Sequence, residues 1–305
     1  MKNGSKYHGA VVPLVTPFTA QGALDEAALE RLVEAQIVGG VEGIFVLGTT
    51  GEGAHVPRAL RRRLVEVAVK RAAKRTLIFV GLGDVRLADV AEANEFFHAG
   101  ADAVVVHPPI AEKVATDRLQ DWFRALLEKM EGPVLLYNMP MTTGVSIPLD
   151  AVENLLGHPK FVGLKDSENN PQRLEETMRR FGGKKDFAVF VGVGALMEKG
   201  LKLGADGIVP SVGNLIPDVC HQLCVAAEKS DWRVAESLYS RMSAVAAVYQ
   251  KGRTLNESLA ALKAAVHCQG LCAPGVLPPL HSLPKIEVEK IRGEMAALHL
   301  LNGKA

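Results

Sequence analysis

The sequence has few cysteines, no excess charge of either sign and no long apolar run, and each absence excludes a class of protein. Four cysteines in 305 residues are too few for a disulfide-stabilised scaffold. Lys and Arg number 35 against 34 Asp and Glu, so we expect neither nucleic acid nor a membrane surface as a partner. No segment reaches the roughly 18 consecutive apolar residues of a membrane span. Because Met1–Ala10 is polar, unlike a signal peptide, we expect a cytoplasmic protein.

The four cysteines form two pairs with the same spacing. Cys220 and Cys224 are four residues apart, and so are Cys268 and Cys272. Residues i and i+4 share one face of a helix, which favours a packing role for the first pair. The alternative is a zinc site made of four thiolates, although structural zinc pairs usually lie in tight turns. The sequence leaves open whether the cysteines do anything beyond packing.

Short apolar segments alternate with longer amphipathic ones along most of the chain. Runs such as Leu77–Val80 are apolar throughout, as expected of parallel strands buried on both faces. The predicted strands are Val11–Phe18, Gly43–Gly48, Thr76–Gly83, Asp102–Pro109, Pro133–Pro140, Phe161–Ser167, Phe187–Gly194 and Gly207–Val212. The predicted helices between them are Asp25–Val38, Arg58–Ala73, Leu87–Ala99, Thr116–Lys129, Leu149–Leu156, Gln172–Arg180, Ala195–Leu203 and Ile216–Lys229.

Eight strand–helix units predict an α/β fold, a (β/α)8 TIM barrel spanning residues 1–230. An open doubly wound sheet is the alternative, but no G-x-G-x-x-G follows the first strand. Residues 231–305 are predicted to form a C-terminal helical extension. Its helices are expected at Asp231–Lys251, Thr254–Cys268 and Ile286–His299.

Active sites of such barrels lie at the carboxyl ends of the strands, and Lys165 is the most informative residue there. It follows the apolar segment Phe161–Leu164, so its side chain leaves a strand and not a solvated helix. By the period of two it shares a face with Gly163, whose missing side chain leaves room for it. Burial lowers the pKa of a lysine by disfavouring the ammonium. The neutral amine is a nucleophile that forms Schiff bases with ketones.

Other strand ends carry groups that suit the same chemistry. Tyr137 ends the fifth strand and is able to shuttle protons, while Thr49 and Thr50 follow the second strand in a glycine-rich segment. Their hydroxyls and the neighbouring backbone N–H groups suit a carboxylate. Each group has a structural alternative: a lysine in an ion pair, a buried tyrosine or a simple turn. Their convergence at one end of one barrel favours the catalytic interpretation.

Three ordered motifs, Gly48-Thr49-Thr50-Gly51-Glu52, Tyr137-Asn138-Met139-Pro140 and Gly163-Leu164-Lys165-Asp166-Ser167, resemble the dihydrodipicolinate synthase/N-acetylneuraminate lyase family. The resemblance runs from about Gly9 to the C-terminal helices. It implies a class I aldolase without a cofactor or metal, usually a homotetramer, whose small-molecule substrates are pyruvate, or another 2-oxo acid, and an aldehyde. It assigns the Schiff base to Lys165 and the proton shuttle to Tyr137. The full set of predicted site residues is catalytic Lys165, Tyr137, Thr49 and Thr50, with substrate binding by Thr50, Gly48, Thr142, Gly192 and Val209.

Two positions depart from the synthases of this family. Where this chain has Thr142, those synthases carry an arginine that binds the carboxylate of the second substrate. Where it has Ile110, they carry a tyrosine just after the fourth strand. A threonine does not replace the bidentate fork of an arginine. Met139 and Met141 would also make the second-substrate pocket less polar, and the segment from Val209 to Asn214 is similar to members acting on 2-keto-3-deoxy acids.

We therefore predict a pyruvate-dependent carbon–carbon lyase or aldolase that acts through a Lys165 Schiff base. The alternatives within the family are a 4-hydroxy-tetrahydrodipicolinate synthase of lysine biosynthesis and a keto-deoxy sugar acid dehydratase using the same imine. A metal-dependent aldolase is disfavoured because the nine histidines are scattered, with no H-x-H pair. A non-catalytic 2-oxo acid binding protein would need neither Lys165 nor Tyr137.

Overall fold

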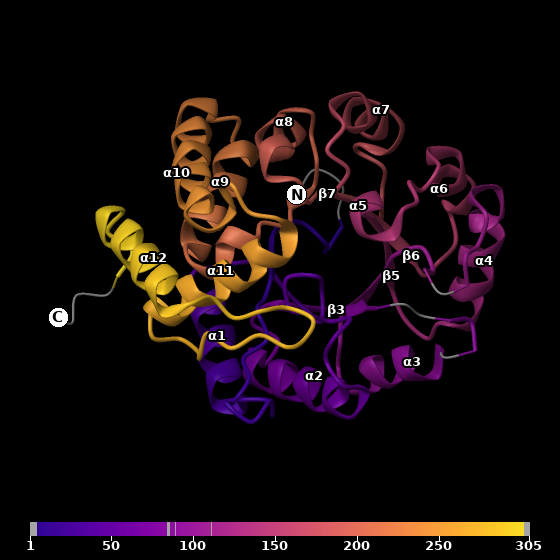
Figure 1. Cartoon of the computed structure of the whole chain (residues 1–305). Helices are drawn as coiled ribbons and strands as arrows, with labels where there is room; N and C mark the ends of the chain where they lie inside the picture. The colour runs from indigo at the N-terminus through magenta and orange to yellow at the C-terminus, as the bar shows by residue number, and fades with distance from the viewer. Residues whose placement is uncertain (1–4, 84–85, 89, 111, 302–305) are drawn as a thin grey trace.

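In the computed structural model, which describes residues 5–83, 86–88, 90–110 and 112–301, parallel strands close into one barrel in chain order. The first strand pairs with both the second and the last, so the barrel has no free edge. Figure 1 shows the helices surrounding the strands. The (β/α)8 prediction is confirmed. The strands are β1 Gly9–Pro13, β2 Gly43–Val46, β3 Leu77–Leu82, β4 Ala103–Val106, β5 Val134–Asn138, β6 Phe161–Asp166, β7 Ala188–Val191 and β8 Gly207–Ile208.

The helices follow the predicted order, with local differences at their ends. Asp25 caps the first helix by accepting a hydrogen bond from the backbone N–H of Ala28 at 2.9 Å. The third helix begins at Val90, whereas Leu87–Ala88 form a turn and residue 89 of the predicted span lies outside the described residues. The helices are α1 Glu26–Val38, α2 Arg58–Ala72, α3 Val90–His98, α4 Leu119–Lys129, α5 Pro140–Thr143, α6 Leu149–Leu155, α7 Pro171–Phe181, α8 Met197–Lys202, α9 Pro217–Glu228, α10 Trp232–Gln250, α11 Leu255–Cys268 and α12 Lys285–Ala297.

All eight predicted strands are longer than the observed ones, and the errors in the fifth and the last concern the site. The fifth strand ends at Asn138 because Pro140 opens the short helix α5, and proline suits the first helical position. The last strand ends at Ile208 and is followed by a 3-10 turn over Ser211–Asn214. There the Asn214 side chain donates to the carbonyl of Pro13 at 2.9 Å and accepts from the N–H of Val15 at 3.0 Å. It thereby ties the β8 loop to β1.

The strands are buried on both faces, so the molecule has two apolar layers. Residues such as Phe45, Phe79, Leu135 and Phe190 point into the barrel and form one cluster. The alternate residues point outward and pack against the helices in a second, larger cluster. Because side chains alternate along a strand, Leu135 and Tyr137 of β5 and their register partners Gly163 and Lys165 of β6 continue the inward face to the carboxyl end of the barrel. This alternation decides which motif residues enter the cavity there.

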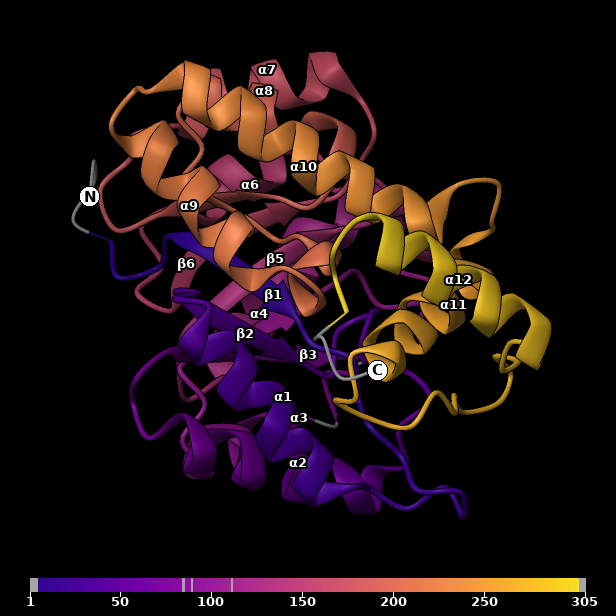
Figure 2. The ribbon, with the colours of Figure 1, turned by 90° about the vertical axis from the view of Figure 1, so that its left-hand side faces the viewer.

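The C-terminal helices lie against one side of the barrel. Figure 2 shows α10 running beside α9, with α11 and α12 beyond it. On α9, Cys220 and Cys224 are buried, and the Cys220 thiol lies 3.8 Å from the sulfur of Met242 on α10. Among the described residues, no group of three or more His, Cys, Asp or Glu is arranged to hold a metal ion. The division into domains at residue 230 stays a prediction.

None of the helices in the described part of the chain is both long enough and apolar enough to cross a membrane.

Candidate active site

Lys165 and Tyr137 face each other inside the barrel. They are register partners on the neighbouring strands β6 and β5, and each is 6% exposed. The Lys165 Nζ lies 3.8 Å from the centre of the Tyr137 ring and 4.9 Å from that of Phe45. The amine is therefore enclosed by aromatic rings at the carboxyl end of the barrel, where catalytic groups of this fold are found.

Burial sets the ionisation of this pair. It lowers the pKa of Lys165, since the ammonium loses its hydration, and the phenol of Tyr137 offsets only part of that effect. Burial raises the pKa of Tyr137, but the positive charge of Lys165 and hydrogen bonding to Thr49 and Ser167 outweigh it, so that pKa is lowered. The amine of Lys165 thus loses its proton, and becomes nucleophilic, more readily than that of an exposed lysine, and the phenol beside it is more acidic than usual.

Behind the pair, the next residues of both strands form a polar network on the outward face. The Asn138 amide donates to both carboxylate oxygens of Asp166, at 3.1 and 3.2 Å. Its carbonyl oxygen accepts from the N–H of Ile147 at 2.9 Å. Asp166 also accepts from the Arg173 guanidinium at 2.7 Å. This network fixes β5 against β6 and therefore fixes the phenol against the amine.

Lys165 opens into a cavity of about 930 Å³, counting the space open to solvent, a size typical of ligand sites. Among the described residues that line it, Lys165 is the one charged side chain, and most polar groups are neutral hydroxyls and amides. These polar groups are Thr49, Thr50, Tyr137, Ser167, Asn169, Ser211, Tyr249, Gln250 and Ser258. The predicted residues Gly192 and Val209 line the same cavity.

Of the predicted site residues, Gly48 and Thr142 do not line the Lys165 cavity. They line an adjoining cavity that shares Thr49 and Tyr137 with the first. Thr142 is on α5, and its hydroxyl donates to the carbonyl of Met139 at 3.1 Å. Ile110 also lines this cavity, and the lining residues that the structure describes include neither lysine nor arginine.

Two glycines act differently in the site. At Gly192 a Cβ would lie 2.0 Å from the Ser167 hydroxyl oxygen and 3.2 Å from the Lys165 Cε, so its missing side chain makes room for both groups. At Gly163 the nearest atom to a Cβ is the carbonyl oxygen of Ala188, at 2.6 Å. Gly163 is therefore required by the close approach of β7, and the sequence-based explanation that it makes room for Lys165 is not the main one.

Sequence reasoning missed several residues of the cavity wall. Phe45 was detectable, because it lies on the inward face of β2, whose loop carries the threonines. Tyr249 and Gln250 were not, because they belong to α10, far along the chain from the strand ends. The Ser211 and Tyr249 hydroxyls are hydrogen bonded at 2.8 Å, which joins the β8 loop to that helix.

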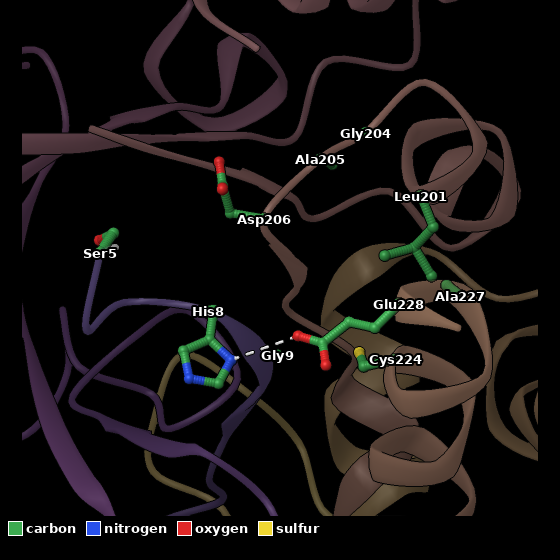
Figure 3. A pocket seen from close by; sticks show the side chains of 10 residues that line it. All are labelled: Ser5, His8, Gly9, Leu201, Gly204, Ala205, Asp206, Cys224, Ala227 and Glu228. Carbon is green, nitrogen blue, oxygen red and sulfur yellow. Dashed lines mark ion pairs between the residues drawn. The ribbon is translucent and has the colours of Figure 1, made fainter. Parts of the chain in front are cut away.

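A smaller cavity lies at the opposite, amino-terminal end of the barrel. Figure 3 shows its lining, in which His8 and Glu228 face each other at 3.8 Å. The Cys224 thiol reaches this cavity, but burial raises its pKa and keeps it protonated. Since a protonated thiol is a poor nucleophile, this cavity is a weaker candidate for catalysis than the one holding Lys165.

Comparison with known proteins agrees with this geometry. Residues 6–297 match the model of the Dihydrodipicolinate synthetase family. The chain is 31% identical over 292 residues to the 4-hydroxy-tetrahydrodipicolinate synthase of Thioalkalivibrio sulfidiphilus, covering 95% of this chain and 97% of that protein. It is 30% identical over 300 residues to the enzyme of the same name from Halorhodospira halophila, covering 97% and 98%.

Solved structures give the same result. The dihydrodipicolinate synthase of Bacteroides thetaiotaomicron superposes with a TM-score of 0.90 at 31% identity, covering 95% of this chain and 98% of that one. YagE, a prophage protein of the dihydrodipicolinic acid synthase family from E. coli K12 solved in complex with pyruvate, has a TM-score of 0.89 at 26% identity, covering 96% and 99%.

Proposed function

Because the chain belongs to the dihydrodipicolinate synthetase family and is thus an enzyme of the lyase and aldolase type, we propose that it makes or breaks a carbon–carbon bond with pyruvate through a Schiff base on Lys165. The observation that carries this proposal is the buried amine of Lys165 lying 3.8 Å from the Tyr137 ring. A lysine whose pKa is lowered by burial, placed beside a proton donor, has what imine chemistry requires.

The reaction begins when the neutral amine of Lys165 attacks the C2 carbonyl of pyruvate. The attack gives a carbinolamine. Tyr137 supplies the proton with which the carbinolamine hydroxyl leaves as water, and an iminium remains on Lys165. Loss of a proton from C3 gives the enamine, whose C3 then attacks the aldehyde carbon and forms the new bond. The resulting alkoxide takes up a proton, and water hydrolyses the imine to release the product and the free lysine. Cleavage is the reverse sequence.

Thr49 and its neighbours suit the remaining tasks. The Thr49 side chain bonds the Tyr137 hydroxyl, which makes it the relay between the phenol and the substrate. Thr50 lines the Lys165 cavity, and its hydroxyl, with the backbone of the turn, would bind the pyruvate carboxylate. Gly192 and Val209 would border the bound pyruvate. Gly48 and Thr142 would contact the second substrate, since they line the adjoining cavity.

The lining also indicates the kind of aldehyde. Around Lys165 it offers neutral donors and acceptors such as Asn169, Ser211 and Gln250, and the described lining of the adjoining cavity has no lysine or arginine. An anionic aldehyde would lose its hydration there without gaining an ammonium or guanidinium partner. We therefore propose an uncharged, hydroxyl-bearing aldehyde, so that the cleaved substrate is a 2-keto-3-deoxy acid. A dehydratase of such acids would use the same imine.

The second candidate is a 4-hydroxy-tetrahydrodipicolinate synthase, favoured by the names of the curated relatives at about 30% identity. Thr142 and Ile110 do not favour it, because neither supplies a charged or phenolic group to the second substrate.

Trapping with borohydride tests the proposal. Reduction in the presence of pyruvate should add the mass of one reduced pyruvate per chain, and peptide mapping should place it on Lys165. No adduct, or an adduct elsewhere, would overturn the mechanism, and activity abolished by EDTA would favour a metal-dependent aldolase. The products formed from a panel of substrates then distinguish the three activities. An aldolase joins neutral hydroxyaldehydes to pyruvate, a dehydratase removes water from keto-deoxy acids, and a synthase condenses aspartate semialdehyde with pyruvate.

The assembly and the cellular location are also proposals. The family resemblance supports a homotetramer, although one dihydrodipicolinate synthase of the same fold is a monomeric variant. Light scattering on the purified chain tests the tetramer. The cytoplasmic location stays a prediction, to be tested by fractionation.

A further inference from the structure

A buried ion pair joins the loop after β2 to the C-terminal helices. The Glu52 carboxylate and the Lys263 ammonium lie 2.5 Å apart, and their side chains are 3% and 1% exposed. Glu52 follows the two threonines of the site, and Lys263 is on α11, 211 residues further along the chain. Neither side chain lines the Lys165 cavity; Glu52 lines the adjoining cavity, and Lys263 lines neither of the two.

Both partners are held by further contacts. The second carboxylate oxygen of Glu52 accepts a hydrogen bond from the N–H of Leu277 at 2.7 Å. The Lys263 Nζ lies 4.5 Å from the centre of the Phe18 ring. Glu52 thus binds two parts of the C-terminal region at once, namely α11 and the segment that follows it.

On the barrel side, the pair is rigidly connected to Thr49. The N–H of Glu52 donates to the carbonyl of Thr49 at 3.1 Å, and that of Gly53 to the carbonyl of Gly48 at 3.0 Å. Glu52 has a φ of +56°, an uncommon value for a residue with a side chain. At Gly53 a Cβ would lie 1.8 Å from the carbonyl oxygen of Leu47. A turn wound this tightly transmits a shift of Glu52 to the threonines.

On the other side, the pair is connected to the wall of the cavity. Leu255, Leu259 and Lys263 are spaced four residues apart and share one face of α11. Leu255 and Leu259 line both the Lys165 cavity and the adjoining one. A shift of Lys263 relative to Glu52 would therefore move this wall relative to Thr49.

Stability alone is a poor reason for such a pair. Removing two charges from water costs about as much as their attraction returns, and well-packed apolar residues of similar size often serve equally well. What an apolar pair does not provide is a directional link that fixes one register between the turn and the helix. The pair is therefore better explained by the geometry that it imposes.

We propose that Glu52 and Lys263 are positioning residues, which hold the Thr49 turn against α11 so that the Thr49 hydroxyl meets Tyr137 and the proton transfers of the imine are fast. The inference rests on the proposed function. It separates two steps: the amount of imine present at equilibrium depends chiefly on the Lys165 amine, whereas the rate at which C3 loses a proton depends on the aligned relay. Loss of the pair should therefore lower that rate more than the amount of imine.

The two steps are measured separately on the full chain with pyruvate alone. Borohydride trapping counts the imine, and NMR in heavy water follows the exchange of the pyruvate methyl protons, which reports enamine formation. Glu52→Gln and Lys263→Met should each lower the exchange rate at saturating pyruvate at least about tenfold, while the trapped fraction stays within twofold of the wild type.

Two further variants separate positioning from loss of stability. Each single substitution leaves a buried charge without its opposite charge, which lowers the Tm. The double variant Glu52→Gln/Lys263→Met removes both charges and should recover much of the Tm but not the exchange rate. The matched control is Glu42→Gln at the other end of the barrel, where Glu42 accepts from the Ala10 N–H and contacts His221, both at 2.7 Å. It should lower the Tm and leave exchange unchanged.

The outcomes are distinct. If the folded double variant exchanges pyruvate protons at the wild-type rate, or if Glu42→Gln slows exchange as much as Glu52→Gln, the pair is merely structural and the inference is wrong. If the wild type itself gives no adduct at Lys165, the proposed function fails first.

Discussion

Tyr137 and Lys165 occupy the same register on two neighbouring parallel strands, and the amine lies 3.8 Å from the centre of the phenol ring. Their relative position is thus set by backbone hydrogen bonds of the sheet and not by the flexibility of two loops. A site built on strands is held more precisely than one built on loops. This arrangement leads to the following predictions.

Lys165→Ala should abolish turnover with the fold intact. The substitution removes the nucleophile but leaves a small apolar side chain inside an apolar barrel, so the circular dichroism spectrum should not change. We expect kcat to fall by at least about 10³-fold and the borohydride adduct with pyruvate to disappear. Full activity in this variant would rule out the imine. The control is Lys160→Ala, at a partly exposed lysine just before the same strand, whose ammonium contacts the carbonyl of Glu128; it should retain both activity and adduct.

Tyr137→Phe should slow proton transfer and preserve the imine. The ring remains against the Lys165 amine, but the hydroxyl that contacts Thr49 and Ser167 is lost. We expect kcat to fall about 10² to 10⁴-fold, measured by steady-state kinetics. After a long incubation with pyruvate, borohydride reduction should still produce the adduct on Lys165. A decrease in kcat of less than about tenfold would show that another group carries the proton.

The value of kcat/KM for pyruvate should rise with pH, and this rise should occur at a lower pH than the pKa of an ordinary lysine. The neutral amine is the reactive form, so kcat/KM for pyruvate increases as pH rises through the pKa of Lys165. Burial lowers that pKa, which moves the rise toward neutral pH. The pH profile of kcat/KM reports it, because this ratio reflects the free enzyme. A rise centred near the ordinary lysine value of 10.5 would contradict the effect of burial.

Asn138→Ala should lower both stability and activity. Asn138 is fully buried, and its loss leaves the N–H of Ile147 and the carboxylate of Asp166 with fewer partners. We expect the free energy of unfolding to fall by about 3 kcal/mol, measured by urea denaturation. The matched control is Asn154→Ala, which removes an exposed hydrogen bond to Gln120 and should cost less than about 0.5 kcal/mol. Equal losses would show that the network does not hold the strands.

Thr142→Arg should shift the preference for the second substrate. It adds a cation to a cavity whose described lining has no lysine or arginine. The ratio of kcat/KM for 4-oxobutanoate to kcat/KM for pentanal, an uncharged aldehyde of similar size, should rise at least about tenfold, as one charge-assisted hydrogen bond allows. Thr142→Gln is the neutral control and should leave the ratio within about twofold. A change shared by both aldehydes would show that Thr142 does not face the second substrate.

The sequence alone determined the barrel and its reactive pair. Apolar runs such as Leu77–Val80 identify strands buried on both faces, and their alternation with helices requires parallel pairing. Because parallel strands of one barrel end on one face, Tyr137 and Lys165 had to meet there. Their spacing in the chain did not matter for this conclusion. The period of two then gave the inward direction of both side chains.

Only the tertiary structure decided what surrounds that pair. The site is divided into two cavities, with Thr142 and Gly48 in one and Thr50 in the other, and the helix α5 that ends the fifth strand early contributes residues to both. The contact between Glu52 and Lys263 spans 211 residues, and neither residue has a local pattern that points to the other. Such contacts are determined by how distant segments pack, so the sequence specified the chemistry and the packing specified the shape in which it takes place.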